Sequence, residues 1–183
     1  MATKYITIEC IAEWAKVFEH NRDLHGYKNA WDDTEGRTTI NLIMSNDDFD
    51  KLKKAGSLKR GTPDAQGRGV NVKVDRKWKT GRDWEDGAPE VLRPDGNPWN
   101  PKVDGEIGNG SKVRVQVSVA VLDATAITRL EKIKVLELVE YEGRDSDFYK
   151  DETGDTPAPK PEAKAPAKDP APAGADLDDE IPF

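Results

Sequence analysis

Positive charges and aromatic rings are interleaved near the middle of the chain, and together these two side-chain types can bind a nucleic acid strand. Five Lys and Arg residues and two Trp residues lie within residues 73–84, and a further Trp follows: Lys73, Arg76, Lys77, Trp78, Lys79, Arg82, Trp84 and Trp99. Cations neutralise phosphate groups, and flat rings stack on unpaired bases. The segment therefore predicts a site for single-stranded nucleic acid, with a solvated basic face as the alternative interpretation of the cations.

Four further residues are candidates for the same site. Lys112 and Arg114 lie on the polar side of an alternating stretch, which should point them away from a core. Tyr27 and Trp31 lie in a polar loop, where an aromatic ring has few apolar neighbours in the sequence. All four are therefore included in the predicted interface.

The tryptophans can serve either as stacking surfaces or as core residues. Pro, Gly, Asp and Asn surround Trp84 and Trp99, which favours a position at the surface or packed within a loop. Trp14 lies in an alternating stretch, and we expect it in the core. Both roles stay open for Trp78.

The net charge of the whole chain hides its basic centre. The formal net charge is −7, and residues 151–183 hold nine acidic residues and three Lys, a net of −6, so residues 1–150 carry only −1. Within them, residues 51–82 hold eleven Lys and Arg against two Asp, a net of +9. The overall charge would argue against nucleic acid as a partner, but its distribution argues for it.

Catalytic interpretations find little support in the residues. Asp32, Asp33 and Glu35 could hold a divalent metal, but no partner carboxylate stands at a recognisable spacing, and a solvated loop explains them better. His20 and His25, with a single Cys in the chain, fall short of a structural zinc site. No phosphate-binding Gly-Lys-Ser/Thr sequence is present, and no nucleophile stands beside a base. We therefore predict a binding protein without a metal or cofactor; a metal-dependent nuclease is the minor alternative.

Alternating apolar residues predict five short strands and one helix. The strand candidates cover residues 3–18, 38–44, 70–75, 112–121 and 130–141, and residues 3–18 fit helical spacing as well. Between the second and third candidates, Ser45 or Asn46 should cap a short helix that Gly56 ends. The set predicts a mainly β protein with a five-stranded barrel of the oligonucleotide-binding type, the OB-fold. The common version of that barrel places its helix between the third and fourth strands.

Two long segments have no periodic apolar face. Residues 80–110 contain four Pro and are predicted as an irregular loop, a feature that in a compact domain tends to be functional. Residues 151–175 contain six Pro and seven Ala, and we predict a disordered linker over residues 143–175. The last eight residues, 176–183, then form an acidic tip with a few apolar residues, which could bind a protein partner or serve only for solubility.

The tip resembles the C-terminal tip of bacterial single-stranded-DNA-binding proteins, which ends in an acidic run followed by Ile-Pro-Phe and recruits replication and repair enzymes. The matching residues are Asp178, Asp179, Glu180, Ile181, Pro182 and Phe183. The body is similar to bacteriophage single-stranded-DNA-binding proteins, through residues 14–19 (Trp-Ala-Lys-Val-Phe-Glu) and 107–115 (Ile-Gly-Asn-Gly-Ser-Lys-Val-Arg-Val). This second resemblance favours a strand over residues 3–18 and again implies the OB-type barrel.

The two resemblances imply a protein that coats and protects single-stranded DNA in replication, recombination and repair. Residues 1–142 would form the DNA-binding domain, and the tip would recruit partner enzymes. A homo-oligomer is compatible with this interpretation, as is an RNA-binding or strand-annealing protein that uses the same surface.

The remaining features of the sequence concern location. No apolar run approaches the roughly 20 residues that a membrane-spanning helix needs, and no signal peptide is visible. The single Cys cannot form an intramolecular disulfide. We therefore expect a cytoplasmic protein, in the host cytoplasm if a phage encodes it.

Overall fold

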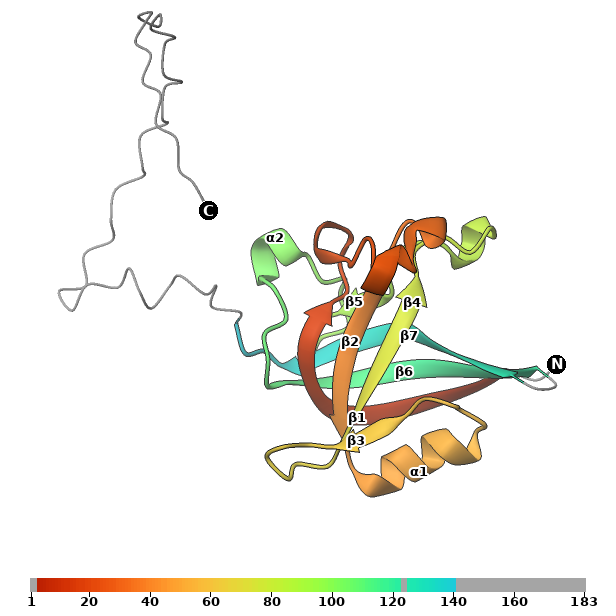
Figure 1. The fold of residues 1–183 in the computed structure, drawn as a ribbon. Helices are drawn as coiled ribbons and strands as arrows, with labels where there is room; N and C mark the ends of the chain where they lie inside the picture. Colours follow the sequence, from red (N-terminus) through yellow and green to blue (C-terminus); the bar gives the residue numbers. More distant parts are fainter. Residues whose placement is uncertain (1–2, 123–124, 141–183) are drawn as a thin grey trace, which may run out of the picture. The chain divides into compact units, whose positions relative to one another are not determined.

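A seven-stranded, mainly antiparallel sheet is the main structural element of the described residues (Figure 1). The computed structural model describes residues 3–122 and 125–140; the predicted linker, 143–175, and the predicted tip, 176–183, lie outside the described residues. The strands are β1 (Thr3–Lys16), β2 (Arg37–Met44), β3 (Gly61–Pro63), β4 (Val70–Lys77), β5 (Glu90–Leu92), β6 (Ser111–Leu122) and β7 (Thr125–Glu137). Their order across the sheet is β3-β4-β2-β1-β6-β7-β5, and only the β5–β7 pair is parallel.

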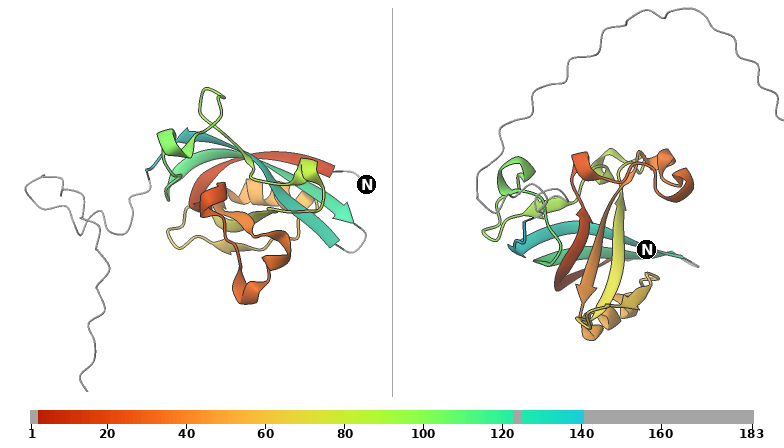
Figure 2. Two further views of the ribbon diagram at one scale, coloured as in Figure 1. Left: turned by 90° about the horizontal axis from the view of Figure 1, so that it is seen from above. Right: turned by 60° about the vertical axis from the view of Figure 1, so that its left-hand side comes forward.

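The sheet curves into a barrel because its two halves share one long strand. The first part of β1 pairs with β6 from Thr3 to Ala12, and its second part pairs with β2 from Ile11 to Lys16. In the right-hand view of Figure 2, β2 and β4 run across the direction of β6 and β7. On the side away from β1 the two halves meet again, where β4 contacts β7. The five long strands therefore form a barrel that closes in the order β1-β2-β4-β7-β6, as an OB-type fold requires.

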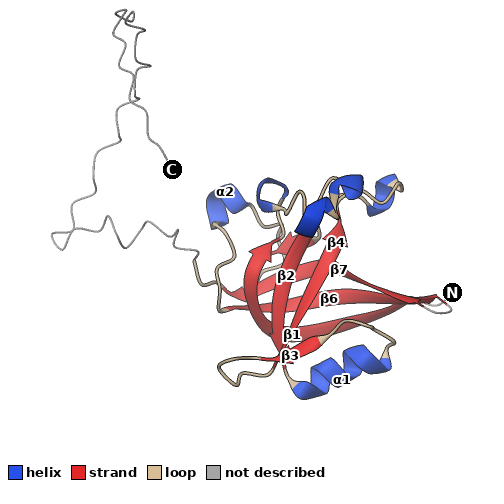
Figure 3. Ribbon diagram, in the orientation of Figure 1, coloured by secondary structure: helices blue, strands red, loops and turns tan. Residues whose placement is uncertain are grey.

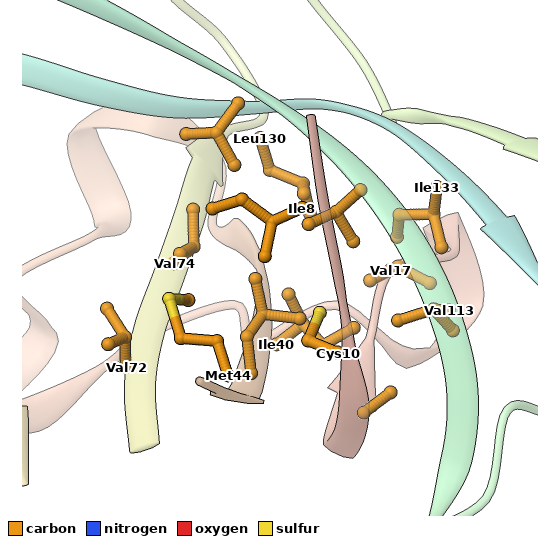
Figure 4. Packing of buried hydrophobic residues seen from close by; sticks show 14 of the residues in the cluster. Ile8, Cys10, Val17, Ile40, Met44, Val72, Val74, Val113, Leu130 and Ile133 are labelled. Carbon is orange, nitrogen blue, oxygen red and sulfur yellow. The ribbon is translucent and has the colours of Figure 1, made fainter. Parts of the chain in front are cut away.

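Alternation along each long strand supplies the core. Inward-pointing apolar side chains of β1, β2, β4, β6 and β7 meet at the barrel axis (Figure 4). Those with almost no exposed surface include Ile8, Ile40, Leu42, Met44, Val72, Val74, Val113, Val115, Leu130 and Ile133. Each such side chain stabilises the fold by about 1.5–3 kcal/mol relative to an exposed position. The alternating apolar residues therefore contribute strongly to the free energy of folding.

The helix α1 (Asn46–Lys54) closes one end of the barrel, at the bottom of Figure 3. The hydroxyl of Ser45 accepts a hydrogen bond from the backbone N–H of Asp48, and Leu52 is fully buried. Acidic residues stand in the first turn and lysines in the last, which suits the helix dipole. The predicted helix and its position after the second strand are confirmed. The other short helices, α2 (Pro101–Asp104) among them, lie at the opposite end of the barrel (Figure 3).

Predicted boundaries were wrong for residues 80–110 and at both ends of the last strand, which ends at Glu137 and not at 141. Residues 80–110 are not wholly irregular: they contain a 3-10 turn, η4 (Asp83–Glu85), the strand β5 and the helix α2. The last strand begins at Thr125, five residues before the predicted start at 130. The first buried residue of this strand, Thr128, is polar, and its hydroxyl lies 2.7 Å from that of Ser57. A search for alternating apolar residues therefore misses the start of the strand. The short helices of the described residues include none that is long and apolar enough to cross a membrane.

Burial of the single cysteine gives a test of the barrel. Cys10 points into the core at 9% exposure, and burial, with a smaller contribution from Asp48, raises the pKa of its thiol to about 12. We expect native protein at pH 8 to resist alkylation of this thiol, because the reactive thiolate is scarce and enclosed. The measurement is the mass shift with iodoacetamide, with and without denaturant. Rapid labelling of the folded protein would contradict the described packing of β1.

Candidate nucleic-acid interface

The connection between β1 and β2, residues 17–36, folds back toward β2 and β4 and is fixed there by backbone hydrogen bonds. It contains three 3-10 turns, η1 (Glu19–Asn21), η2 (Tyr27–Asn29) and η3 (Asp32–Thr34). Asp23 and Arg37 exchange two backbone hydrogen bonds, of 3.0 and 2.8 Å. Beyond the end of β4, Trp78 N–H donates to the carbonyl of Gly36 at 3.1 Å, and Lys79 N–H donates to that of Thr34 at 2.9 Å. The predicted loop aromatics are thereby joined to the predicted basic segment.

Trp31 stands at the centre of this junction with a cation on each of two neighbouring strands. The guanidinium of Arg37, on β2, lies 5.4 Å from the centre of its ring, and Lys73 Nζ, on β4, lies 5.5 Å from it. Gly26 has a φ of +65°, and a Cβ there would lie 2.5 Å from the Trp31 ring, so only glycine fits. The ring is partly buried and held in place before any ligand arrives.

Two more aromatic residues, Trp78 and Tyr27, have a positively charged side chain next to the ring. The guanidinium of Arg22 lies 4.3 Å from the Trp78 ring centre, and it also donates to the carbonyls of Glu19 at 2.9 Å and Glu35 at 3.1 Å. Tyr27 is 81% exposed, and Lys28 Nζ lies 5.3 Å from its ring centre. Trp31, Trp78 and Tyr27 therefore each have a positive charge beside a π surface, the combination that stacks bases and attracts phosphate.

The outer face of β2 and β4 continues the positive surface. Register places Lys77 opposite Arg37, Asp75 opposite Thr39, and Lys73 opposite Asn41. We call this set the basic-aromatic surface, and its members are Arg22, Tyr27, Lys28, Trp31, Arg37, Lys73, Lys77, Trp78 and Lys79. Six of them were predicted from the sequence. Arg22, Lys28 and Arg37 were missed, although Arg37 begins a strand whose polar side continues with Thr39 and Asn41.

A carboxylate stabilises the middle of this surface. Asp75 binds Arg37 at 2.7 Å and also binds Lys59. Burial by itself would raise the pKa of Asp75, but the hydrogen bonds and charges of Lys59 and Arg37 outweigh it, so the pKa lies below its usual value. The group therefore stabilises the fold above its unfolded pKa, and this contribution is lost as the pH falls through the folded value.

Arg76 was predicted to contact nucleic acid, and its burial speaks against that role. The residue is 8% exposed, and its guanidinium binds Glu131 of β7 at 2.9 Å. It also donates to the backbone carbonyls of Gly87 and Glu85, each at 2.9 Å. In β4 the inward positions alternate with the outward ones, and Arg76 takes an inward position at the end of the strand. We therefore leave it out of the interface.

The remaining predicted residues lie elsewhere. Trp99 packs against the core, with its ring N–H donating to the Gly105 carbonyl at 3.0 Å, which is the loop-packing role that its neighbours in the sequence favoured. Arg82 is exposed beside η4 and pairs with Glu85 at 3.4 Å. Trp84 belongs to η4, but its side chain is not described.

Lys112 and Arg114 point outward from β6, as predicted, but on the other half of the barrel. Each meets a carboxylate of a neighbouring strand: Lys112 Nζ lies 2.8 Å from Glu137, and Arg114 Nε lies 2.9 Å from Glu9. Their charges are thus matched one to one, whereas near Trp31 the carboxylate of Asp75 is shared by Arg37 and Lys59. The structure does not bring them together with the basic-aromatic surface, and they become a second, weaker candidate.

The expectation for Trp14 was wrong, and two of the three loop carboxylates, Asp32 and Glu35, form ion pairs. Trp14 is 64% exposed instead of lying in the core. Asp32 lies 3.0 Å from His25 Nδ1, and Glu35 lies 3.6 Å from Lys79. Within the described ranges, no three His, Cys, Asp or Glu side chains are placed to share a metal ion.

Strand order, barrel closure and the loop over β2 and β4 together define an OB-type fold with a basic, aromatic surface on one side. Solved structures that are similar to it include two phage proteins. One is gp2.5, a single-stranded DNA-binding protein encoded by bacteriophage T7, with a TM-score of 0.52, 19% identity, and coverage of 86% of this chain and 100% of that one. The other is a single-stranded DNA-binding protein from bacteriophage Enc34 in complex with single-stranded DNA, with a TM-score of 0.50, 13% identity, and coverage of 76% and 89%.

These similarities confirm, for the fold, the resemblance to bacteriophage single-stranded-DNA-binding proteins that two short motifs predicted. No protein-family model matches the chain, and no curated protein does. At this level of identity, the residues that bind a ligand have to be argued from this chain alone.

Arg76 and Lys77 form a matched pair that separates a structural cation from a surface cation. Changing Arg76 to Ala should lower the free energy of unfolding by about 1.5–3 kcal/mol, because it removes the buried ion pair with Glu131 and the charged hydrogen bonds to the carbonyls of Gly87 and Glu85. Changing Lys77 to Ala should alter stability by less than about 0.5 kcal/mol. Urea denaturation of both variants measures the difference. Equal stability of the two would place Arg76 at the surface and overturn the described closure of the barrel.

Proposed function

We propose that this protein binds single-stranded DNA through the basic-aromatic surface and has no catalytic activity of its own. The observation that carries the proposal is Trp31, fixed against Gly26 with Arg37 and Lys73 beside its ring. A preformed aromatic platform flanked by cations on adjacent strands matches the chemistry of an unpaired base and its phosphates. Both similar structures are named as single-stranded-DNA-binding proteins of phages, which supports the same ligand for this chain.

Binding would combine two kinds of contact. Bases would stack on Trp31, Trp78 and Tyr27, which every base can do, so little sequence preference is expected. Exposed lysines such as Lys73 and Lys77 would neutralise phosphates and release counterions, so affinity should fall as salt rises. Because backbone hydrogen bonds fix the loop, little conformational entropy would be lost on binding. Protection of exposed strands in replication, recombination and repair would follow from such coverage.

Two double variants, each removing two positive charges, decide between the two candidate faces. The first changes Arg22 and Lys73 to Ala, and the second changes Lys112 and Arg114 to Ala. For oligothymidylate, the first should bind more weakly, and its slope of log K against log salt should be shallower by about 0.7 for each lost phosphate contact. The second should bind like the unchanged protein, because carboxylates already neutralise its two cations.

Fluorescence anisotropy over a series of salt concentrations is the measurement, with melting curves to confirm that both variants fold. Weaker binding by the Lys112 and Arg114 variant alone would move the site to the β6 face. Absence of binding by the unchanged protein would reject the proposed function. Competition between DNA and RNA oligomers of the same sequence then decides which nucleic acid is preferred.

We further propose that the last six residues of the sequence, 178–183, recruit enzymes of DNA replication and recombination. This proposal rests on the resemblance of the tip to that of bacterial single-stranded-DNA-binding proteins. Phe183 and Ile181 would enter an apolar pocket on the partner, and Asp178, Asp179 and Glu180 would meet its Arg or Lys side chains.

Two Phe→Ala changes test the recruiting role. Phe183→Ala should abolish capture of the partner enzymes, because one buried aromatic carries much of the energy of a small interface. Phe148→Ala, which lies within the predicted linker, should leave capture unchanged. Affinity for DNA should be the same in both, since neither alters a charge. Affinity capture followed by mass spectrometry compares the bound proteins, and retention of the same partners by Phe183→Ala would reject the recruiting role.

A further inference from the structure

A β-bulge near the end of β1 turns Trp14 out of the barrel. Ile8, Cys10 and Ala12 point inward, and strict alternation would send Trp14 inward after them. Between Glu13 and Lys16 the register with β2 shifts by one residue. Ala15 contacts the core in place of Trp14, whose side chain is 64% exposed. Among the tryptophan side chains that the structure describes, the others are all partly buried.

The bulge holds Trp14 in an unfavourable backbone conformation. Its φ is +50°, in the left-handed region that bulky residues rarely adopt. The side chain of Asn109 accepts a hydrogen bond of 2.7 Å from Trp14 N–H, and Gly110 N–H donates to the Ala12 carbonyl at 2.9 Å. The turn before β6 thus supports the bulge from outside the sheet. Bulges that re-aim a side chain, and strain that the surroundings maintain, both concentrate at functional sites.

The bulge adjoins the basic-aromatic surface. Register places Glu13 of β1 beside Asn41 of β2, and Asn41 beside Lys73 of β4, all on the outer face of the sheet. Two strand spacings, about 10 Å, therefore separate the β1 bulge from Lys73. A nucleic acid strand that crosses β4, β2 and β1 would pass from Trp31 toward Trp14. Lys16, exposed and next in β1 on that face, adds a cation at this end.

We propose that Trp14 stacks on a base of the same bound DNA strand, at a subsite separate from that of Trp31. The inference rests on the proposed function and extends it, because it gives the path of the strand across the sheet. The subsite would be reached only by a strand long enough to span the distance from Trp31.

The test is a length series with oligothymidylates of about 4 to 16 nucleotides, the range of site sizes of single OB domains. Trp14→Ala should bind the shortest oligomers that the unchanged protein binds with the same affinity. For long oligomers its affinity should be roughly 5- to 150-fold weaker, the loss expected for one stacked base. Trp31→Ala should weaken binding at every length.

Three control variants separate stacking from other effects. Trp14→Phe keeps a ring and should retain most of the affinity for long oligomers, whereas Trp14→Leu keeps apolar area without a π face and should lose it. Tyr5 is also 64% exposed on β1, but its register partner is Ser118 of β6, on the other half of the barrel. Tyr5→Ala should therefore bind like the unchanged protein. Melting temperatures of all variants confirm the fold.

Several outcomes would overturn the subsite. Trp14→Ala with unchanged affinity at every length would remove Trp14 from the DNA path, and a change in molecular mass in that variant would assign the residue to self-association instead. Equal weakening at all lengths would merge Trp14 with the site of Trp31. The proposed function stands in each of these cases, since it fails only if the unchanged protein binds no single-stranded DNA.

Discussion

The guanidinium of Arg76 crosses the seam where β4 meets β7, and the barrel closes around it. It binds the carboxylate of Glu131 and the carbonyl of Leu130 on one side of the seam, and the carbonyls of Glu85 and Gly87 on the other. A buried cation is unfavourable unless every donor is satisfied, so these partners are fixed together or not at all. The seam therefore couples closure of the barrel to the position of the β4–β5 connection. This connection comes directly after Trp78 and Lys79 of the basic-aromatic surface in the sequence.

That surface is built as a rigid platform. The backbone hydrogen bonds that join Trp78 to Gly36 and Lys79 to Thr34 unite two segments more than forty residues apart in sequence. Trp31 is held by the close approach of Gly26, and Trp78 carries Arg22 on its ring. Each contact orders a side chain before a ligand arrives, which lowers the entropy that binding has to overcome. Stacking on such a platform uses the face of a base and not its hydrogen-bonding edge. The same fixed rings that bind the strand are therefore expected to bind it with little sequence preference.

Among the described residues, the neighbours of a positive charge, more than the number of such charges, determine whether it can attract phosphate. On β6, Lys112 and Arg114 face Glu137 and Glu9 across the sheet, and a phosphate there would have to compete with carboxylates already in place. On β4, Lys73 faces Asn41, which carries no charge. Cross-strand register thus decides which cations attract a polyanion, and the sign of the whole chain's net charge decides very little.

Local pattern in the sequence was sufficient for the strands that alternate cleanly and for the helix between Ser45 and Gly56, because periodicity and capping act over a few residues. The outward direction of Lys112 and Arg114 followed in the same way. Only the tertiary structure decided that Trp14 is exposed, that Arg76 is buried, and that Arg22 rests on Trp78. One inserted residue in a strand reverses every side chain after it, and the partner of a buried charge lies on a strand that is distant in sequence. These features depend on contacts across the barrel, and no local periodicity records them.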